Sequence, residues 1–116
     1  HLRHSSKWII RLGDGTEESH AKAQSAIDNL WMFTDELFEM NDIDNEMLNQ
    51  KLGVDCSLLK SDWDKIIDEV LSEATLKKPE NIHMTTGGRE GIHTEHLGHL
   101  LSDMQYLQRA YPDAKW

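Results

Sequence analysis

The chain has 116 residues, and 12 Lys plus Arg against 21 Asp plus Glu give a formal net charge of −9 at pH 7. This length is that of one domain, and 38% hydrophobic residues suffice for a modest core. No transmembrane helix is expected, because the apolar runs fall far short of the roughly 20 residues that such a helix needs. The single Cys56 excludes an internal disulfide framework and, with no secretory signal in the first residues, predicts a cytoplasmic protein.

Charge is unevenly distributed along the chain. Residues 1–11 carry three bases and no acid, residues 12–50 carry one base and ten acids, and residues 51–116 carry eight bases and eleven acids. An acidic segment repels phosphate backbones, so the middle segment gives no support to nucleic-acid binding. A solvated helix face is the favoured interpretation of this segment, and a surface for a basic partner is the alternative.

The first predicted helix runs from the first residue to a Gly-Asp-Gly stop at 13–15. Its apolar residues Leu2, Ile9 and Leu12 follow a period near 3.6. No capping residue precedes this pattern, which predicts that the helix is the back end of a longer one.

A second helix is predicted to begin after Thr16, which suits an N-cap, with Glu17 and Glu18 set against the positive end of the helix dipole. Its apolar stripe predicts about six turns, ended by the polar stretch 41–44. The stripe consists of Ala23, Ala26, Ile27, Leu30, Trp31, Thr34, Leu37 and Phe38.

A short helical segment is predicted over 46–52, and a third long helix is predicted to begin with Ser57 as its N-cap. This helix ends before Pro79, with Lys77 and Lys78 complementing the negative end of its dipole. Its stripe consists of Leu59, Trp63, Ile66, Ile67, Val70, Leu71 and Ala74.

The glycine-containing stretch 80–91 predicts an extended loop, and a last helix is expected from Thr94 to just before Pro112. Its stripe consists of Leu97, Leu100, Leu101, Met104, Leu107 and Tyr111. No segment alternates with the period of a strand. The sequence therefore predicts an all-α fold with four helices, two of them long, that pack as a bundle in a single domain over 1–116.

Glu17 and His20 form a Glu-x-x-His spacing, which places a carboxylate and an imidazole on one helix face, as carboxylate-bridged di-iron bundles require. Such a site needs a second pair and two further glutamates, and no second pair occurs. An acid in the first turn is also expected for dipole reasons alone, so a structural role is favoured.

His93, His96 and His99 form the densest histidine cluster and could bind a divalent metal such as zinc. Three-residue steps rotate successive side chains around the helix, and no fourth ligand is evident. A histidine-rich helix start packed on a partner is therefore favoured. His1 and His4 form another pair three residues apart, which is more typical of a polar helix face.

Nucleophilic and phosphate chemistry have little support. Cys56 precedes a predicted helix start, but no neighbouring histidine marks it as an activated nucleophile. The loop 87–91 lacks the Lys-Ser/Thr pair of a phosphate loop. The tryptophans are expected to anchor a core or an interface, and Tyr111 and Trp116 are the predicted contacts of the C-terminal end.

Two sequence blocks resemble the phenylacetic acid catabolic proteins. They are Leu-Gly-Asp-Gly-Thr-Glu-Glu-Ser-His at 12–20 and His-Thr-Glu-His-Leu-Gly at 93–98, with further similarity over 1–8 and 104–109. The resemblance covers nearly the whole chain. It is greatest to the C-terminal half of the structural subunits of phenylacetyl-CoA epoxidases.

This resemblance implies a ferritin-like helical bundle in a bacterial multicomponent monooxygenase that epoxidises the ring of phenylacetyl-CoA in phenylacetate catabolism. It implies a non-catalytic structural subunit that forms a hetero-oligomer with a homologous catalytic subunit and other subunits of the complex. The di-iron centre is then expected in the catalytic subunit, and NADPH, FAD and iron-sulfur groups in the reductase component. For this chain itself no cofactor, catalytic residue, nucleic acid or membrane is expected.

The resemblance also bears on the metal candidates. It places His1 at a helix position comparable to a metal-binding histidine of the catalytic relative, but Ser5 and Ser6 replace the Gly-Glu pair expected there. A structural subunit is expected to keep the helical bundle of its catalytic relative but to lack the carboxylates that bind the metal ions. The alternative is that the chain is itself a ferritin-like di-iron oxygenase component that binds metal through Glu17 and His20.

Overall fold

A computed structural model describes residues 1–115 of the chain. The chain divides into two compact units, His1–Thr86 and Gly87–Trp116, and each is described by itself. Within the described residues the regular structure consists of six α-helices and three 3₁₀ helices, with no strand. The all-α class is therefore confirmed, whereas the expected number of four helices is too low. The single-domain assignment stays a prediction.

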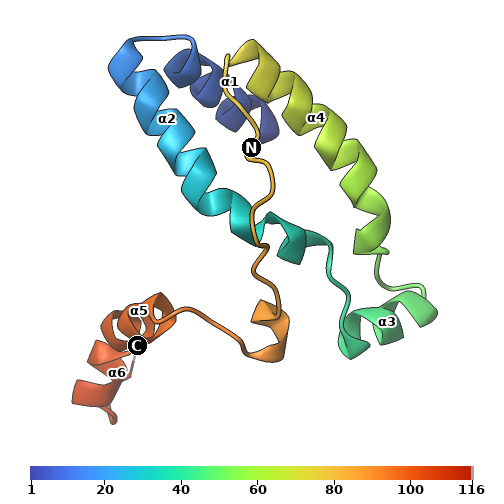
Figure 1. Ribbon diagram of the computed structural model, residues 1–116. Helices are drawn as coiled ribbons and strands as arrows, with labels where there is room; N and C mark the ends of the chain where they lie inside the picture. Colours follow the sequence, from blue (N-terminus) through green and yellow to red (C-terminus); the bar gives the residue numbers. More distant parts are fainter. Residues whose placement is uncertain (116) are drawn as a thin grey trace. The chain divides into compact units, whose positions relative to one another are not determined.

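The first unit is organised by α1 (Leu2–Gly13), which contacts both α2 (Glu17–Leu30) and α4 (Lys60–Glu73). Figure 1 shows α1 at one end of this unit, beside the start of α2 and the end of α4. The predicted Gly-Asp-Gly stop is confirmed, because α1 ends at Gly13 and the chain turns directly into α2.

The core of the first unit lies where these three helices meet. The buried side chains are Ala23, Leu71, Ala74 and Leu76, and those packed around them are Ile9, Ile10, Ile27, Trp31 and Ile67. A β-carbon at Gly13 would overlap the carbonyl oxygen of Ala74 and lie 2.9 Å from the Ala74 methyl group. The glycine that ends α1 is therefore also the point of closest approach between α1 and the end of α4.

The second predicted helix is shorter than its apolar stripe suggests. Thr16 caps it as expected, because its hydroxyl oxygen accepts from the Ser19 backbone N–H at 3.2 Å. The α-helix ends at Leu30, however, and the chain continues as the 3₁₀ helix η1 (Trp31–Phe38). In η1 the Thr34 hydroxyl donates to the Trp31 carbonyl at 2.9 Å, which supports the tighter three-residue turn.

The polar stretch 41–44, which was expected to end the second helix, instead begins the next one. Asn41 and Asp44 form a reciprocal capping box with bonds of 2.9 and 3.0 Å, so α3 (Asp42–Asn49) starts four residues before the predicted segment. Asp55, not Ser57, caps the next element, because its carboxylate accepts from the Ser57 N–H at 3.0 Å. A short 3₁₀ helix, η2 (Cys56–Leu59), then leads into α4.

α4 ends at Glu73, earlier than expected, and the predicted dipole role of two lysines is wrong. Thr75 adopts a left-handed φ of 58°, and the Leu76 N–H donates to the Leu71 carbonyl at 2.9 Å, which closes the helix end. Lys77 and Lys78 therefore lie beyond the last turn and are available for other contacts.

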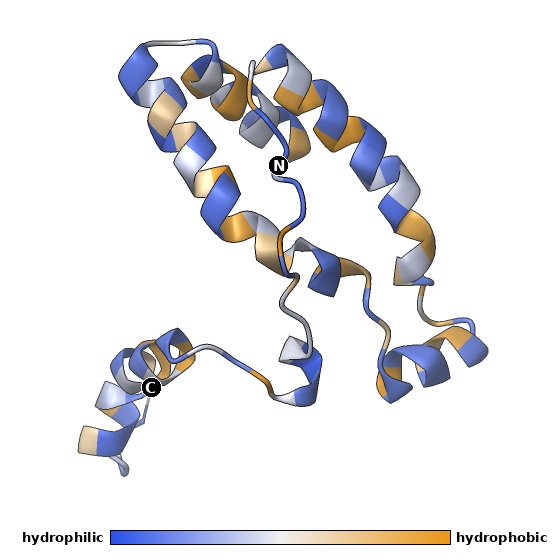
Figure 2. Ribbon diagram, viewed as in Figure 1, coloured by the Kyte–Doolittle hydropathy of each residue, from blue (hydrophilic) through white to orange (hydrophobic). Residues whose placement is uncertain are grey.

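The second unit contains η3 (Gly88–Glu90), α5 (His96–Met104) and α6 (Tyr106–Ala110). The predicted loop is thus interrupted by one short turn, and the predicted last helix starts at His96 and breaks at Gln105. None of its described residues is buried. Figure 2 shows hydrophobic residues on α5 as well as on the helices of the first unit, so both units carry amphipathic helices.

Candidate interaction surface

The three candidate metal ligands do not converge. Glu17 is exposed in the first turn of α2, and His1 precedes the far end of α1, about 18 Å from the α1–α2 turn at 1.5 Å per residue. His20 is half-buried, and its Nδ1 donates to the Gly13 carbonyl at 2.7 Å. The carbonyl can only accept, so this bond fixes the proton on Nδ1. His20 thus ties α2 to the end of α1.

The other predicted candidates are the histidines at the start of α5 and Cys56. His93, His96 and His99 are exposed around the start of α5, and no group of three or more His, Cys, Asp and Glu side chains in residues 1–115 is arranged to hold a metal ion. These donors do not fit a di-iron centre. Cys56 is half-buried and is a free thiol.

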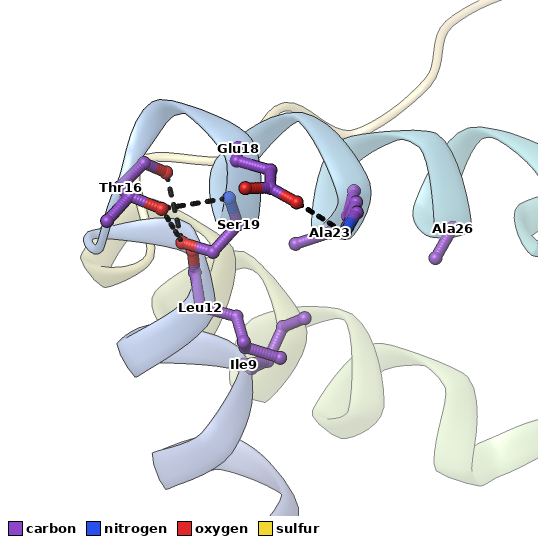
Figure 3. Close-up of a pocket in the computed structure, with 8 residues that line it drawn as sticks. Ile9, Leu12, Thr16, Glu18, Ser19, Ala23 and Ala26 are labelled. Carbon is purple, nitrogen blue, oxygen red and sulfur yellow. Dashed lines mark hydrogen bonds and ion pairs between the residues drawn. The ribbon is translucent and has the colours of Figure 1, made fainter.

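An apolar groove lies between α1 and α2 (Figure 3). Its volume is about 510 Å³, and its apolar lining comes from Ile9 and Leu12 of α1 and from Ala23 and Ala26 of α2. The small alanines leave space that larger side chains would fill. This groove is concave and apolar, which suits a protruding side chain of another helix better than a charged ligand.

The groove has a polar rim at the α1–α2 turn. The Ser19 hydroxyl donates to the Leu12 carbonyl at 2.8 Å, and Figure 3 shows both residues at this rim. Lys22 pairs with Glu18 at 2.6 Å. Both members of this ion pair are largely exposed, so it stabilises the fold little. An apolar centre with a polar edge is the usual composition of a protein-binding surface.

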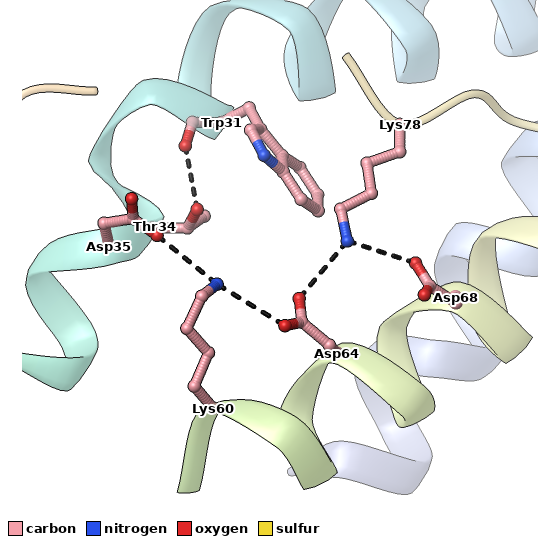
Figure 4. Close-up of polar contacts among 7 residues, drawn as sticks. All are labelled: Trp31, Thr34, Asp35, Lys60, Asp64, Asp68 and Lys78. Carbon is pink, nitrogen blue, oxygen red and sulfur yellow. Dashed lines mark hydrogen bonds and ion pairs between the residues drawn. The ribbon is translucent and has the colours of Figure 1, made fainter. Parts of the chain in front are cut away.

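Elsewhere in the first unit, five charged side chains form what we term the charged bridge (Figure 4). Lys60 lies 3.4 Å from Asp35 and 3.5 Å from Asp64, and Lys78 lies 3.2 Å from Asp64 and 3.3 Å from Asp68. The two lysines thus share one carboxylate and join η1, α4 and the segment after α4. Alternating charges of this kind are worth more than isolated surface pairs.

Aromatic rings lie beneath both lysines of the charged bridge. The Lys60 ammonium group is 5.2 Å from the centre of the Phe38 ring and 5.7 Å from that of Trp63, and the Lys78 ammonium group is 5.3 Å from that of Trp31. Trp63 also contacts Trp31 and Phe38 at centroid distances of 5.8 and 5.4 Å. The 3₁₀ helix η1 is therefore fixed to α4 by tilted and edge-to-face ring contacts and by cation–π contacts.

The charged bridge shifts two pKa values. Burial alone would raise the pKa of Asp64, but the hydrogen bond from Lys78 and the charges of Lys60 and Lys78 hold it below its ordinary value. Burial alone would lower the pKa of Lys78, but its hydrogen bonds and charge interactions with Asp64 and Asp68 raise it. Both shifts favour the charged forms, so the bridge is intact at neutral pH.

Residues 76–86, which we term the strap, run back along α2 and η1. The Gln24 side chain donates to the Lys77 carbonyl at 2.9 Å and accepts from the Lys77 N–H at 2.8 Å. The Thr85 N–H donates to the Met32 carbonyl at 2.8 Å. Backbone bonds at both ends therefore hold the strap in place.

Much apolar surface remains uncovered. Trp8, Leu30, Leu37 and Ile43 are among the large hydrophobic residues of the first unit that are at least half exposed, and Leu100, Met104 and Tyr106 are among those of the second. The predicted contact Tyr111 is exposed, and Trp116 lies outside the described residues. The described chain therefore offers apolar surfaces of the kind that bind other polypeptides.

The comparisons with known proteins agree with the resemblance in sequence. The profile of the family described as phenylacetic acid catabolic protein matches residues 1–116, so the chain belongs to this family, which is of the ferritin-like type. The chain is 45% identical over 116 residues to the C subunit of 1,2-phenylacetyl-CoA epoxidase from Escherichia coli (strain K12). The match covers 100% of this chain and 47% of that protein, so the chain spans about half the length of its curated relative.

No helix within residues 1–115 is long and apolar enough to cross a membrane.

Sequence reasoning missed the groove, the charged bridge and the strap. The Glu18–Lys22 pair at the groove rim carries a local signal, because opposite charges four residues apart on a helix face each other. Gln24 and Lys77 are 53 positions apart, and no local pattern links them. Such contacts depend on the path of the whole chain.

Proposed function

We propose that the chain is part of a non-catalytic structural subunit of a multicomponent monooxygenase that epoxidises the ring of phenylacetyl-CoA in phenylacetate catabolism. The observation that carries this proposal is the 45% identity over the whole chain to the C subunit of such an epoxidase. Family membership over residues 1–116 supports the same role.

The partner in this proposal is a homologous ferritin-like catalytic subunit, joined by the other subunits of the complex. The di-iron centre would belong to that catalytic subunit, and NADPH, FAD and iron-sulfur groups to the reductase component. The chain would contribute by burying an interface and holding the helices of its partner in place.

The exposed surface leaves room for an interface, with the rest of the full-length chain or with a partner subunit. The chain has an accessible area of 9446 Å² and a mass of 13.4 kDa. A self-contained globular protein of that mass exposes about 6,500 Å², and two separate domains of the sizes of the two units would expose about 7,600 Å² in total. Obligate interfaces bury areas as large as this excess.

Light scattering tests the proposal. The full-length chain is measured alone and after mixing with the candidate catalytic subunit, over a range of concentrations. We expect a defined complex of fixed stoichiometry. A full-length chain that keeps its own mass at every concentration of that subunit would refute the structural role.

A further inference from the structure

The outward face of α1 carries a row of bases that nothing described so far uses. Arg3, Lys7 and Arg11 are spaced four residues apart, which places them along one side of the helix at intervals of about 6 Å. All three are exposed, and α1 contains no acid. The row is thus the most basic surface of an otherwise acidic chain.

Within residues 1–115, none of the three bases of this row forms an ion pair, whereas lysines elsewhere in the first unit do. Arg11 instead lies over the Trp8 ring, with 5.7 Å between its guanidinium carbon and the ring centre. Helix surfaces usually mix charges of both signs, so an unpaired basic row on a chain of net charge −9 is a positive surface without a partner.

Apolar side chains lie next to the row on the same helix. Trp8 is 51% exposed and Leu12 is 42% exposed, and His4 contacts the Trp8 ring edge-on at 6.4 Å between centroids. Exposed tryptophan beside arginine is the composition of binding hot spots in protein interfaces. We call Arg3, Lys7, Arg11 and Trp8 the basic face of α1.

We propose that the basic face of α1 docks onto an acidic helical surface of another subunit of the same complex, so this inference rests on the proposed function. A straight row of bases on a convex helix matches a helix with acids three or four residues apart. A small anion would be held by a concave set of donors. A second copy of this chain is disfavoured, because two chains of charge −9 repel each other.

The test uses the full-length chain and measures its affinity for the other subunits at low and at physiological salt. The test variant reverses the row, Arg3→Glu with Lys7→Glu and Arg11→Glu. The matched control reverses three other exposed bases, Lys51→Glu with Lys65→Glu and Lys115→Glu. Each reversal changes the charge by two units, so both triple variants carry the same net charge.

We expect the row reversal to weaken association about 100-fold and to remove most of its salt dependence, and the control to weaken it less than about 3-fold. Trp8→Ala is expected to weaken association about 10-fold. If the wild-type chain associates and both triple variants bind alike, the docking face is wrong while the proposed function stands. If the wild-type chain associates with no other component of the complex, both fail.

Two further results would overturn the inference. If the row reversal lowers the melting temperature of the free full-length chain more than the control does, the face packs against its own chain. If the row reversal abolishes binding of pyrophosphate, used as a probe, while leaving association with the other subunits intact, the row serves a small anion. Retention of the wild-type melting temperature, together with the selective loss of association, supports the docking face.

Discussion

The two units of the chain use the same amphipathic pattern with different results. In the first unit α4 buries Leu71 to 7% exposure, whereas in the second unit α5 leaves Leu100 at 55%. Both residues belong to apolar stripes with helical spacing, which predicted both helices. An apolar stripe thus predicts a helix but not what covers it. Two pairs of variants test this difference between the units, and two further pairs test the polar contacts that the first unit has in addition.

Two helical glycines should respond in opposite ways. Gly13→Ala places a methyl group against the backbone of Ala74 and should lower the free energy of unfolding by about 3 kcal/mol, since overpacking outweighs the better helix propensity of alanine. Gly98→Ala in α5 meets nothing within 4 Å and should be neutral or stabilise by up to about 1 kcal/mol. Urea unfolding of the full-length chain measures both, and equal effects would contradict the comparison.

Truncating one leucine of the apolar stripe in each unit compares the burial of the two stripes directly. Leu71→Ala removes a buried side chain and should cost about 2 kcal/mol, the lower end of the usual range because the small core can partly collapse. Leu100→Ala should change the stability of the free chain by less than about 0.5 kcal/mol. A larger loss for Leu100 in thermal unfolding would show that α5 is covered within the full-length chain.

The strap depends on one side chain. Gln24→Ala removes both bonds to the Lys77 backbone and should cost about 1.5 kcal/mol. Gln50→Ala is the matched control, because Gln50 bonds only the exposed Glu46 one turn away. Hydrogen exchange at Lys77 should accelerate in the first variant alone, and unchanged exchange there would refute the role of Gln24.

The charged bridge should have the smallest effect and a defined pH dependence. Asp64→Asn should cost about 1 kcal/mol at pH 7, and Asp62→Asn, in an exposed pair with Lys65, close to nothing. Because folding lowers the pKa of Asp64, its contribution is complete above the ordinary value of 3.8 and is lost as the pH falls through the lowered one. Wild type and variant should therefore keep their full difference above pH 3.8 and converge in stability only as the pH falls below it. A constant difference down to pH 2 would contradict this.

At alkaline pH the stability contributed by the charged bridge depends on pH in the opposite direction. Folding raises the pKa of Lys78, so its contribution is complete below the ordinary value of 10.5 and is lost only as the pH rises through the raised one. The charged bridge is therefore expected to keep its full strength from about pH 5 to pH 10.

Local chemistry in the sequence predicted the local structure well. The Thr16 cap and the end of α1 are confirmed because each depends on a few neighbouring residues. The helix predicted after Thr16 was too long, since periodicity does not distinguish an α-helix from a 3₁₀ continuation such as η1. Ser57 was the wrong cap because Asp55, two residues earlier, accepts hydrogen bonds from both the backbone N–H and the hydroxyl of Ser57.

The candidate surface could be predicted only in part. The row at Arg3, Lys7 and Arg11 follows from sequence spacing, but its exposure and lack of ion pairs required the packing of α1. The closeness of Gly13 to Ala74 joins positions 61 residues apart, and no periodic pattern encodes such a contact. The family resemblance, by contrast, was available from short sequence blocks and is confirmed by the family match.

The most direct test of the structural role is the iron content of each subunit after the complex has been assembled and its chains separated, with the full-length chain also measured alone. The account predicts iron in the catalytic subunit and none bound in fixed proportion to this chain. About two irons per copy of this chain, as carboxylate-bridged di-iron bundles hold, would contradict it. In that case Glu17, His20 and His1 would be the first residues to substitute.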